Sequence, residues 1–313
     1  MLDEISKHFR EKLKVFFLTD NLILNNKVIP IHQDNFKEIV PATEVKTIAF
    51  VDGGQAELFS GGSLHLSFIR VFAQVMQGKQ KLEAMMKEFY VFTSAAYRNG
   101  EVWYQGKIFS QEESFIDEVD LVLSSHDSSL QSGRERGPIS KVAEVARRLA
   151  ELKLASTVQA DLALLDGSLE KSFPGEEKYI SSQVSSLAKT CSLFTTNGNN
   201  PAVLLQKLSP LQGSWSYSIG GDSYFVKLHP QAKHIFRFQG RSELLPHLLL
   251  QGSDALFLGY PYGLIWADKM ARVSKAEKNS LQAKLLLRPE NREMASYLRT
   301  MNAHEILDGI TQL

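Results

Sequence analysis

The sequence predicts an α/β protein in which a mixed β-sheet is flanked by helices and extended by further antiparallel strands. Two apolar runs of the same design carry this prediction: Thr47–Val51 leads into Asp52-Gly53-Gly54, and Leu162–Leu165 leads into Asp166-Gly167. Runs that are apolar at every position are typical of strands covered on both faces. A helical repeat over 139–155 directly precedes the second run. A helix followed by a strand is the usual connection between parallel strands, so Asp52 and Asp166 are expected at one edge of the same sheet.

The first half of the chain predicts a helix, an arm and a meander. Apolar residues recur on one face of 3–18, which predicts a helix, and prolines break up 20–45, which is expected to be irregular. Strands are expected over 46–52, 55–60, 63–76, 85–95 and around 103–104, because these segments are rich in β-branched and aromatic residues. Short connections between consecutive strands favour an antiparallel meander.

The second half alternates helices and strands. Helical periodicity predicts helices over 139–155, 176–189, 244–250, 262–284, 289–300 and 303–312. Strands are expected over 158–166 and 190–196, and Asn197–Pro201 predicts a turn. Trp215–Ile219, Tyr224–Leu228 and His234–Phe238 alternate around Gly-rich connections and predict the additional antiparallel strands.

The composition is that of an ordinary globular protein. The chain has 313 residues, of which 43% are hydrophobic and 22% charged, and its formal net charge is zero. A basic field over the whole molecule is therefore absent, so any anion must be bound by local patches. The single cysteine, Cys191, excludes an internal disulfide, and the charged start of the chain is not that of a signal peptide. We expect a cytoplasmic protein without a membrane span.

The two Asp-Gly pairs admit two interpretations. Asp-Gly is a common turn pair, and a single such run is most simply a turn. Two matched runs can instead place two carboxylates side by side, where hard oxygen ligands attract a divalent cation such as Mg²⁺ or Mn²⁺.

The order of elements resembles the ribonuclease H-like fold, with three antiparallel strands, a helix, a parallel strand and a late helix. In that fold the first strand, first helix, fourth strand and last helix each carry an acidic residue. The resemblance assigns Asp52, Glu144, Asp166 and Asp268 to these places, as catalytic residues and metal ligands. Glu135 and Glu151 are rivals of Glu144. Four carboxylates around two cations would cleave phosphodiesters by a two-metal mechanism.

Several motifs, taken together, resemble the NurA nuclease family. They are Val51-Asp52-Gly53-Gly54, Leu164-Leu165-Asp166-Gly167-Ser168-Leu169, Lys189-Thr190, Phe225-Val226-Lys227-Leu228, Phe236-Arg237, Gly259-Tyr260-Pro261-Tyr262, Ala267-Asp268 and Asn302-Ala303-His304-Glu305-Ile306-Leu307-Asp308. The resemblance runs from about residue 45 to the C-terminus and leaves 77–135 unaligned. It divides the chain into an N-terminal helix and extended arm, 1–45, and a nuclease domain with a ribonuclease H-like core, 46–313.

The resemblance implies a Mn²⁺- or Mg²⁺-dependent deoxyribonuclease that acts on single strands and duplex ends. NurA proteins are homodimers that work with a hexameric HerA-type ATPase in DNA end resection and repair, and some relatives serve in defence against phage. The chain has no Gly-rich loop ending in Gly-Lys-Ser or Gly-Lys-Thr, so the motor would have to be a partner.

Further residues are candidates for contacts with DNA. Arg147, Arg148, Lys189 and Lys227 could hold phosphates, and Tyr260, like Tyr262, could stack on unpaired bases. His304 could carry a proton. Surface or structural roles remain open for each of them.

Three other functions compete with a DNA nuclease. The chain could be a non-catalytic scaffold that binds a hexameric ATPase ring, which predicts complex formation without metal-dependent cleavage. It could be a nuclease directed at RNA. A sugar-kinase-like ATP binder is the third, because Asp-Gly-Gly strand ends also occur there.

Overall fold

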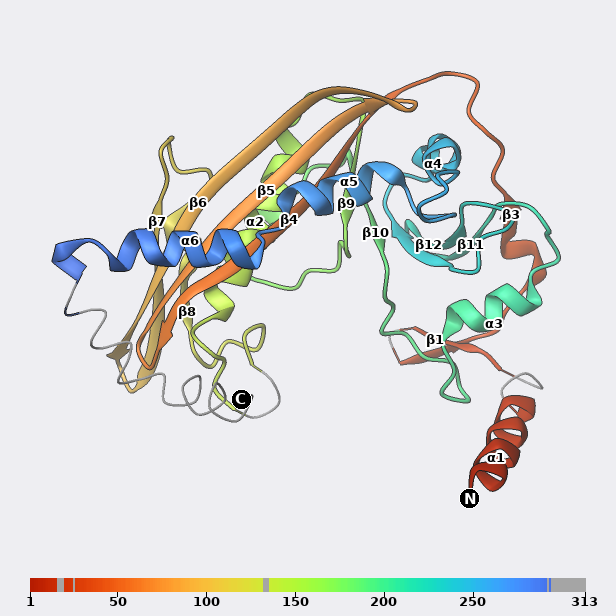
Figure 1. Cartoon of the computed structure of the whole chain (residues 1–313). Helices are drawn as coiled ribbons and strands as arrows, with labels where there is room; N and C mark the ends of the chain where they lie inside the picture. Colours follow the sequence, from red (N-terminus) through yellow and green to blue (C-terminus); the bar gives the residue numbers. More distant parts are fainter. Residues whose placement is uncertain (16–19, 25, 132–134, 292, 294–313) are drawn as a thin grey trace.

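The computed structural model describes the whole chain except residues 16–19, 25, 132–134, 292 and 294–313. Its centre is one mixed sheet of eleven strands in the order β3-β11-β12-β13-β10-β9-β4-β5-β6-β7-β8 (Figure 1). The strands are β3 (Phe36–Glu38), β4 (Thr47–Gly61), β5 (Leu64–Gln77), β6 (Gln80–Arg98), β7 (Glu101–Phe109), β8 (Val122–Ser124), β9 (Leu162–Asp166), β10 (Val184–Ala188), β11 (Trp215–Gly220), β12 (Ser223–Lys227) and β13 (Phe236–Gln239). A separate hairpin joins β1 (Leu22–Leu24) to β2 (Lys27–Ile29).

The centre of the sheet has the strand order of the ribonuclease H-like fold. The strands β4, β5 and β6 form a long antiparallel meander. The strand β9 then pairs in parallel with β4 on one side and with β10 on the other. The remaining strands, β11–β13, extend the same sheet beyond β10 as antiparallel neighbours. The predicted fold class is confirmed, and the antiparallel elaboration belongs to the main sheet.

Helices cover both faces of this sheet. The helix α2 (Lys141–Thr157) packs on one face, where its buried alanine and leucine residues meet the inward side chains of β4, β5 and β9. The helices α4 (Leu245–Gln251) and α5 (Tyr262–Ala271) lie on the other face, and α6 (Lys275–Leu286) continues from α5 (Figure 1). A third cluster lies around Trp215 and Tyr217, next to the strands β1 and β3. The two larger clusters explain why Ile48–Val51 of β4 and Leu162–Leu165 of β9 are apolar at every position.

The predicted N-terminal helix is α1 (Leu2–Val15), which stands apart from the sheet in Figure 1. The segment 20–45, expected to be irregular, contains short strands, and β3 pairs with β11 at the edge of the main sheet. Three-residue strands are too short to show a sequence period. The described helices lack the length and apolar character that a membrane crossing requires.

Two predictions in the second half are wrong. The helix expected over 176–189 is a short 3₁₀ turn, Glu176–Lys178, followed by the strand β10, and 190–196 forms no strand of the sheet. All five side chains of β10 are buried between β9 and β13, so tertiary burial outweighed local helical preference.

The helix expected over 262–284 is broken into α5 and α6 at 272–274. Ser274 caps α6, where its hydroxyl accepts a hydrogen bond from the Glu277 amide at 3.1 Å. The signal for this break is a Ser followed three residues later by Glu, which is typical of a helix start. Of the C-terminal helices, the part that lies within the described residues is a 3₁₀ turn, Pro289–Asn291.

Candidate active site

Asp52 and Asp166 lie side by side on neighbouring parallel strands. Each follows directly on a paired position of β4 and β9, Val51 with Leu165. Phe50 and Leu164 lie two positions before the aspartates and face the cluster that contains α5. Because successive side chains of a strand point to opposite faces, both aspartates lie on the α5 side of the sheet.

The strand β4 does not stop at Asp52, as the sequence predicted, but continues through both glycines to Gly61. The glycines serve close approach rather than a turn. A Cβ atom on Gly53 would lie 2.3 Å from Oε1 of Glu151, and one on Gly54 would lie 2.2 Å from the carbonyl oxygen of Ala271. Helix α2 and the end of α5 therefore press on the strand from opposite faces immediately beyond Asp52.

The glutamate beside Asp52 is Glu151, which the sequence analysis named as a rival of Glu144. Glu151 is buried, with Nε of Arg147 at 3.7 Å from its carboxylate. Glu144 lies in the first turn of α2 and pairs with Lys141 at 2.5 Å. The two glutamates are seven positions apart, almost two full helical turns, so both share one face and sequence spacing alone cannot separate them.

Asp268 and two further groups complete the cluster. Asp268 is on α5, and its side chain pairs with Arg272 at 2.6 Å. Nζ of Lys189, just beyond β10, lies 2.5 Å from Asp166 and 5.2 Å from the ring centroid of Tyr260. The Tyr260 hydroxyl is buried next to Asp166.

The carboxylates repel one another electrostatically. Burial, and then the charges of Asp166, Glu151 and Asp268, raise the pKa of Asp52 to about 8, although the Gly53 amide donates a hydrogen bond to Oδ1 at 2.8 Å. Burial also raises the pKa of Glu151, against the neighbouring arginines Arg147 and Arg148. Burial and the charge of Asp166 raise the pKa of the Tyr260 hydroxyl. Burial is the largest cause of all three shifts, and the negative charge of the neighbouring carboxylates adds to it.

The predicted DNA contacts separate into buried and accessible groups. Arg148 is 9% exposed and is used within the protein, where it donates to the Ser168 carbonyl at 2.7 Å and pairs with Glu176. Lys227 is 7% exposed, and the ring of Tyr260 is 4% exposed, so neither offers a free surface to DNA.

The accessible cations are Arg147 and Lys189. Arg147 is about one-third exposed and donates to the Gly53 carbonyl at 3.1 Å, and Lys189 is half exposed beside Asp166. His304 lies outside the described residues.

The chemical type of the donors fits a hard divalent cation, since Asp52, Asp166, Glu151 and Asp268 supply only carboxylate oxygens. Within the described part of the chain, however, no three His, Cys, Asp or Glu side chains are grouped closely enough to hold an ion as they stand. Two carboxylates are engaged, Asp166 by Lys189 and Asp268 by Arg272. Ion pairs with such exposed cations contribute little to stability, so a divalent cation can replace them.

Several solved structures are similar to this one. The NurA nuclease from Sulfolobus solfataricus has a TM-score of 0.47 and 13% identity, with 81% of this chain and 86% of that chain covered. The fold is similar to that of a NurA protein, as the motifs predicted. The catalytic domain of human Endonuclease V has a TM-score of 0.38 and 14% identity, over 89% of this chain and 98% of that chain.

A third similar structure is Endonuclease V from Ciona intestinalis in complex with a 24-mer DNA that contains an inosine followed by a ribo-adenosine. Its TM-score is 0.37 at 10% identity, over 77% of this chain and 89% of that chain. At these identities the likeness concerns the fold alone. No protein-family model matches the sequence, and no curated protein matches it.

Proposed function

We propose that the chain is a deoxyribonuclease that hydrolyses phosphodiester bonds with the aid of Mn²⁺ or Mg²⁺. One observation carries the proposal: Asp52, Asp166, Asp268 and Glu151 come together from two strands and two helices, and burial together with the charges of the other three raises the pKa of Asp52 to about 8. A structural turn residue has no need of such an arrangement, which is unfavourable until a cation or a proton neutralises it.

The four carboxylates of Asp52, Asp166, Glu151 and Asp268 would hold the cations. A divalent cation supplies a Lewis acid for the phosphate and lowers the pKa of water, and two cations would serve the attacking and leaving oxygens. Arg147 fixes the backbone of Gly53 and neutralises part of the charge on Glu151. Lys189 leaves Asp166 and pairs with a phosphate when DNA binds, which its half-exposed side chain permits.

The sequence resemblance supports the finer parts of the proposal. These are single strands and duplex ends as substrates, a homodimer as the working form, and a HerA-type hexameric ATPase as the partner in end resection, repair or phage defence. Light scattering tests the dimer, and co-purification with such an ATPase tests the partner.

Cleavage of end-labelled single-stranded and duplex DNA with Mn²⁺ or Mg²⁺ tests the activity. Asp52→Asn and Asp166→Asn should each lower the rate at least about 100-fold, since loss of one charge-stabilising group costs that much in other enzymes. Asp222→Asn, in the exposed turn between β11 and β12, is the matched control and should retain the wild-type rate. Metal-independent cleavage, or a stable ATPase complex without any cleavage, would reject the proposal.

A further inference from the structure

A cavity of about 480 Å³ opens directly beside the carboxylates. Three of the residues that line it, Lys189, Tyr260 and Asp268, belong to the candidate active site. The rest of the lining is mainly apolar and includes Leu256 and Phe257 from the loop between α4 and α5. The cavity is thus a continuation of the site, with charge at one end and apolar walls at the other.

The apolar end is an aromatic platform with an open face. The rings of His234 and Phe257 are stacked, with centroids 5.2 Å apart and an interplanar angle of 28°. Behind them, Tyr260 packs edge-on against Phe257 at 6.2 Å and against Phe236 at 5.0 Å. Phe257 is nevertheless 41% exposed and Leu256 72% exposed. Apolar side chains that remain exposed next to a reactive site are typical of a surface that a ligand covers.

The loop that carries this platform is held in shape by its own backbone. The Gly259 amide donates to the Gly252 carbonyl at 2.7 Å, and the Tyr260 amide donates to the Phe257 carbonyl at 3.1 Å. Gly259 has a φ of 89°, and a Cβ atom there would lie 2.5 Å from Cβ of Ala232. The position of Phe257 is therefore preorganised, which lowers the entropic cost of binding a ligand.

We propose that this cavity binds one unpaired nucleobase of the DNA strand whose phosphate lies at the carboxylates, stacked on Phe257 and His234. The inference rests on the proposed nuclease function and adds a base-binding site to it, which would require a free or frayed base next to the cleaved bond. A base inside a duplex has both faces covered, so it must leave its stack before it can enter. Stacking on aromatic rings accepts every base, so no sequence preference is expected.

The combination of groups favours a base over an apolar peptide. Lys189 and Asp268 line the same cavity as the rings, so a charged group such as a phosphate on the occupant would lie within reach of a partner. A nucleotide has this distribution, with a flat aromatic ring at one end and a phosphate at the other. The cavity is also short of polar groups at the platform end, which suits stacking rather than recognition by hydrogen bonds.

A fluorescent base analogue tests the proposal. Single-stranded oligonucleotides with one 2-aminopurine at successive positions would be bound to Asp52→Asn protein, which prevents cleavage. At one position the fluorescence should change sharply on binding, and Phe257→Ala should remove that change and weaken binding about 5- to 150-fold, which is the effect of losing one stacked base at about 1–3 kcal/mol. An oligonucleotide with an abasic residue at the same position should bind the wild-type cavity as weakly as the intact oligonucleotide binds Phe257→Ala. Combining the abasic residue with Phe257→Ala should weaken binding little further.

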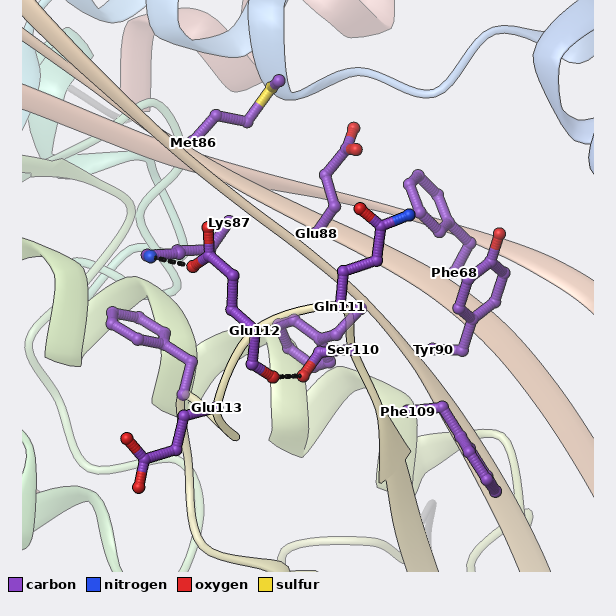
Figure 2. A pocket seen from close by; sticks show the side chains of 12 residues that line it. Phe68, Met86, Lys87, Glu88, Tyr90, Phe109, Ser110, Gln111, Glu112 and Glu113 are labelled. Atoms are coloured by element: carbon purple, nitrogen blue, oxygen red, sulfur yellow. Dashed lines mark hydrogen bonds and ion pairs between the residues drawn. The ribbon is translucent and has the colours of Figure 1, made fainter.

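The matched control is Phe109→Ala. Phe109 is 49% exposed and lines a different cavity, between β6 and the segment after β7, together with Phe68, Tyr90 and Ser110 (Figure 2). It should leave the fluorescence and the affinity unchanged. The same fluorescence and affinity in Phe257→Ala and Phe109→Ala would overturn the proposal. So would a change of oligomeric state in Phe257→Ala with unchanged fluorescence, because that result would show that Phe257 contacts another protein chain. Wild-type cleavage is measured in parallel, so unimpaired cleavage with no base-specific change refutes the base pocket alone, whereas absent cleavage refutes the nuclease.

Discussion

Asp52 shows how a proposed catalytic position can be unfavourable for the fold that carries it. It lies beside Asp166 on the adjacent strand and close to the buried Glu151, and burial together with these charges raises its pKa to about 8. Residues that stabilise a fold avoid such surroundings, and residues that bind cations require them. The same side chain should therefore give opposite results in stability and in activity.

We expect Asp52→Asn to abolish cleavage and to stabilise the metal-free protein at pH 8. In the folded state Asp52 keeps its proton up to a pH of about 8, whereas its ordinary pKa is 3.8. A group whose pKa is raised in the folded state favours folding when it is protonated. This contribution to the free energy of unfolding is complete at pH values below the ordinary pKa and is lost as the pH rises through the folded-state pKa. The free energy of unfolding should thus fall between roughly pH 4 and pH 8, and asparagine should remove this part of the slope.

Thermal unfolding in EDTA at several pH values measures this effect. The difference between variant and wild type should grow from pH 5 to pH 8 and shift Tm by a few degrees at pH 8, because about 1 kcal/mol moves Tm by about 2–4 °C in a chain of this size. Asp222→Asn should keep the wild-type slope. Parallel curves for wild type and Asp52→Asn would contradict the raised pKa.

The two glutamates of α2 give a direct comparison at one helix face. Glu151→Gln should lower cleavage at least about 100-fold, because the buried Glu151 carboxylate lies against Gly53 and belongs to the charge cluster around Asp52. Glu144→Gln should leave the rate within about twofold, because Glu144 pairs with the exposed Lys141 in the first turn. The reverse order of the two effects in a cleavage assay would restore the glutamate that the sequence favoured.

At the scale of single elements, the path of β4 depends on two glycines, because any side chain at these positions would collide with a neighbouring helix. Helix α2 approaches one face at Gly53 and the end of α5 approaches the other at Gly54, so the strand runs on beyond Asp52 between two layers. The sequence showed the Asp-Gly-Gly pattern and predicted a metal-binding aspartate, but it also suggested a turn. The approach of two helices from distant parts of the chain leaves no local signal, and for that reason the turn could not be rejected.

Gly53→Ala and Gly54→Ala should separate activity from stability. An alanine at 53 displaces the end of a flexible side chain, Glu151, so we expect a loss of cleavage of at least about tenfold with about 1 kcal/mol of destabilisation. An alanine at 54 meets the backbone carbonyl of Ala271, which cannot rotate away, so the cost should reach about 1–3 kcal/mol or more.

Cleavage rates and urea midpoints of the two variants test this order. Gly100→Ala is the control for the glycine change itself, although its φ of 88° gives it a modest cost of its own, with no neighbour within 4 Å. A stable Gly54→Ala protein with wild-type midpoint would contradict the close contact with Ala271.

Elements whose sequence has a strong hydrophobic period were predictable from the sequence. Elements that form only because neighbouring strands bury them were not. The helix over 139–155 and the meander strands are present as α2, β4, β5, β6 and β7. The strand β10 was predicted as a helix because its Ser-rich sequence has no strand signal. Its identity as a strand comes from neighbours on both sides, β9 and β13, which are far apart in the sequence.

At the scale of the whole molecule, the strand order brings together residues that are far apart in the sequence. Asp52 and Asp166 were predictable as neighbours because a helix and a parallel strand follow the meander, and that order admits few arrangements. The aromatic cavity beside them was not predictable, because Lys189, His234 and Phe257 come from three connections whose relative position depends on the completed sheet.

A divalent cation should couple the stability of the whole fold to the state of this site. A ligand that binds only the folded protein stabilises it by RT ln(1 + [L]/Kd), about 2.7 kcal/mol at 100-fold excess over Kd. We expect Mn²⁺ to raise Tm by several degrees, more at pH 8 than at pH 6, because protons compete for Asp52 below its pKa of about 8. Thermal unfolding with and without Mn²⁺ measures the shift, and EDTA should reverse it.

The variants decide whether the cation acts at the proposed place. Asp166→Asn removes one ligand and frees Lys189, so it should remove most of the Mn²⁺ shift, and Asp222→Asn should retain all of it. Arg272→Gln releases Asp268 from its ion pair and should leave the shift intact or increase it, because the carboxylate no longer has to be separated from a guanidinium before it binds the cation. A shift that persists in the Asp52→Asn, Asp166→Asn double variant would place the cation elsewhere and leave the carboxylate cluster without its function.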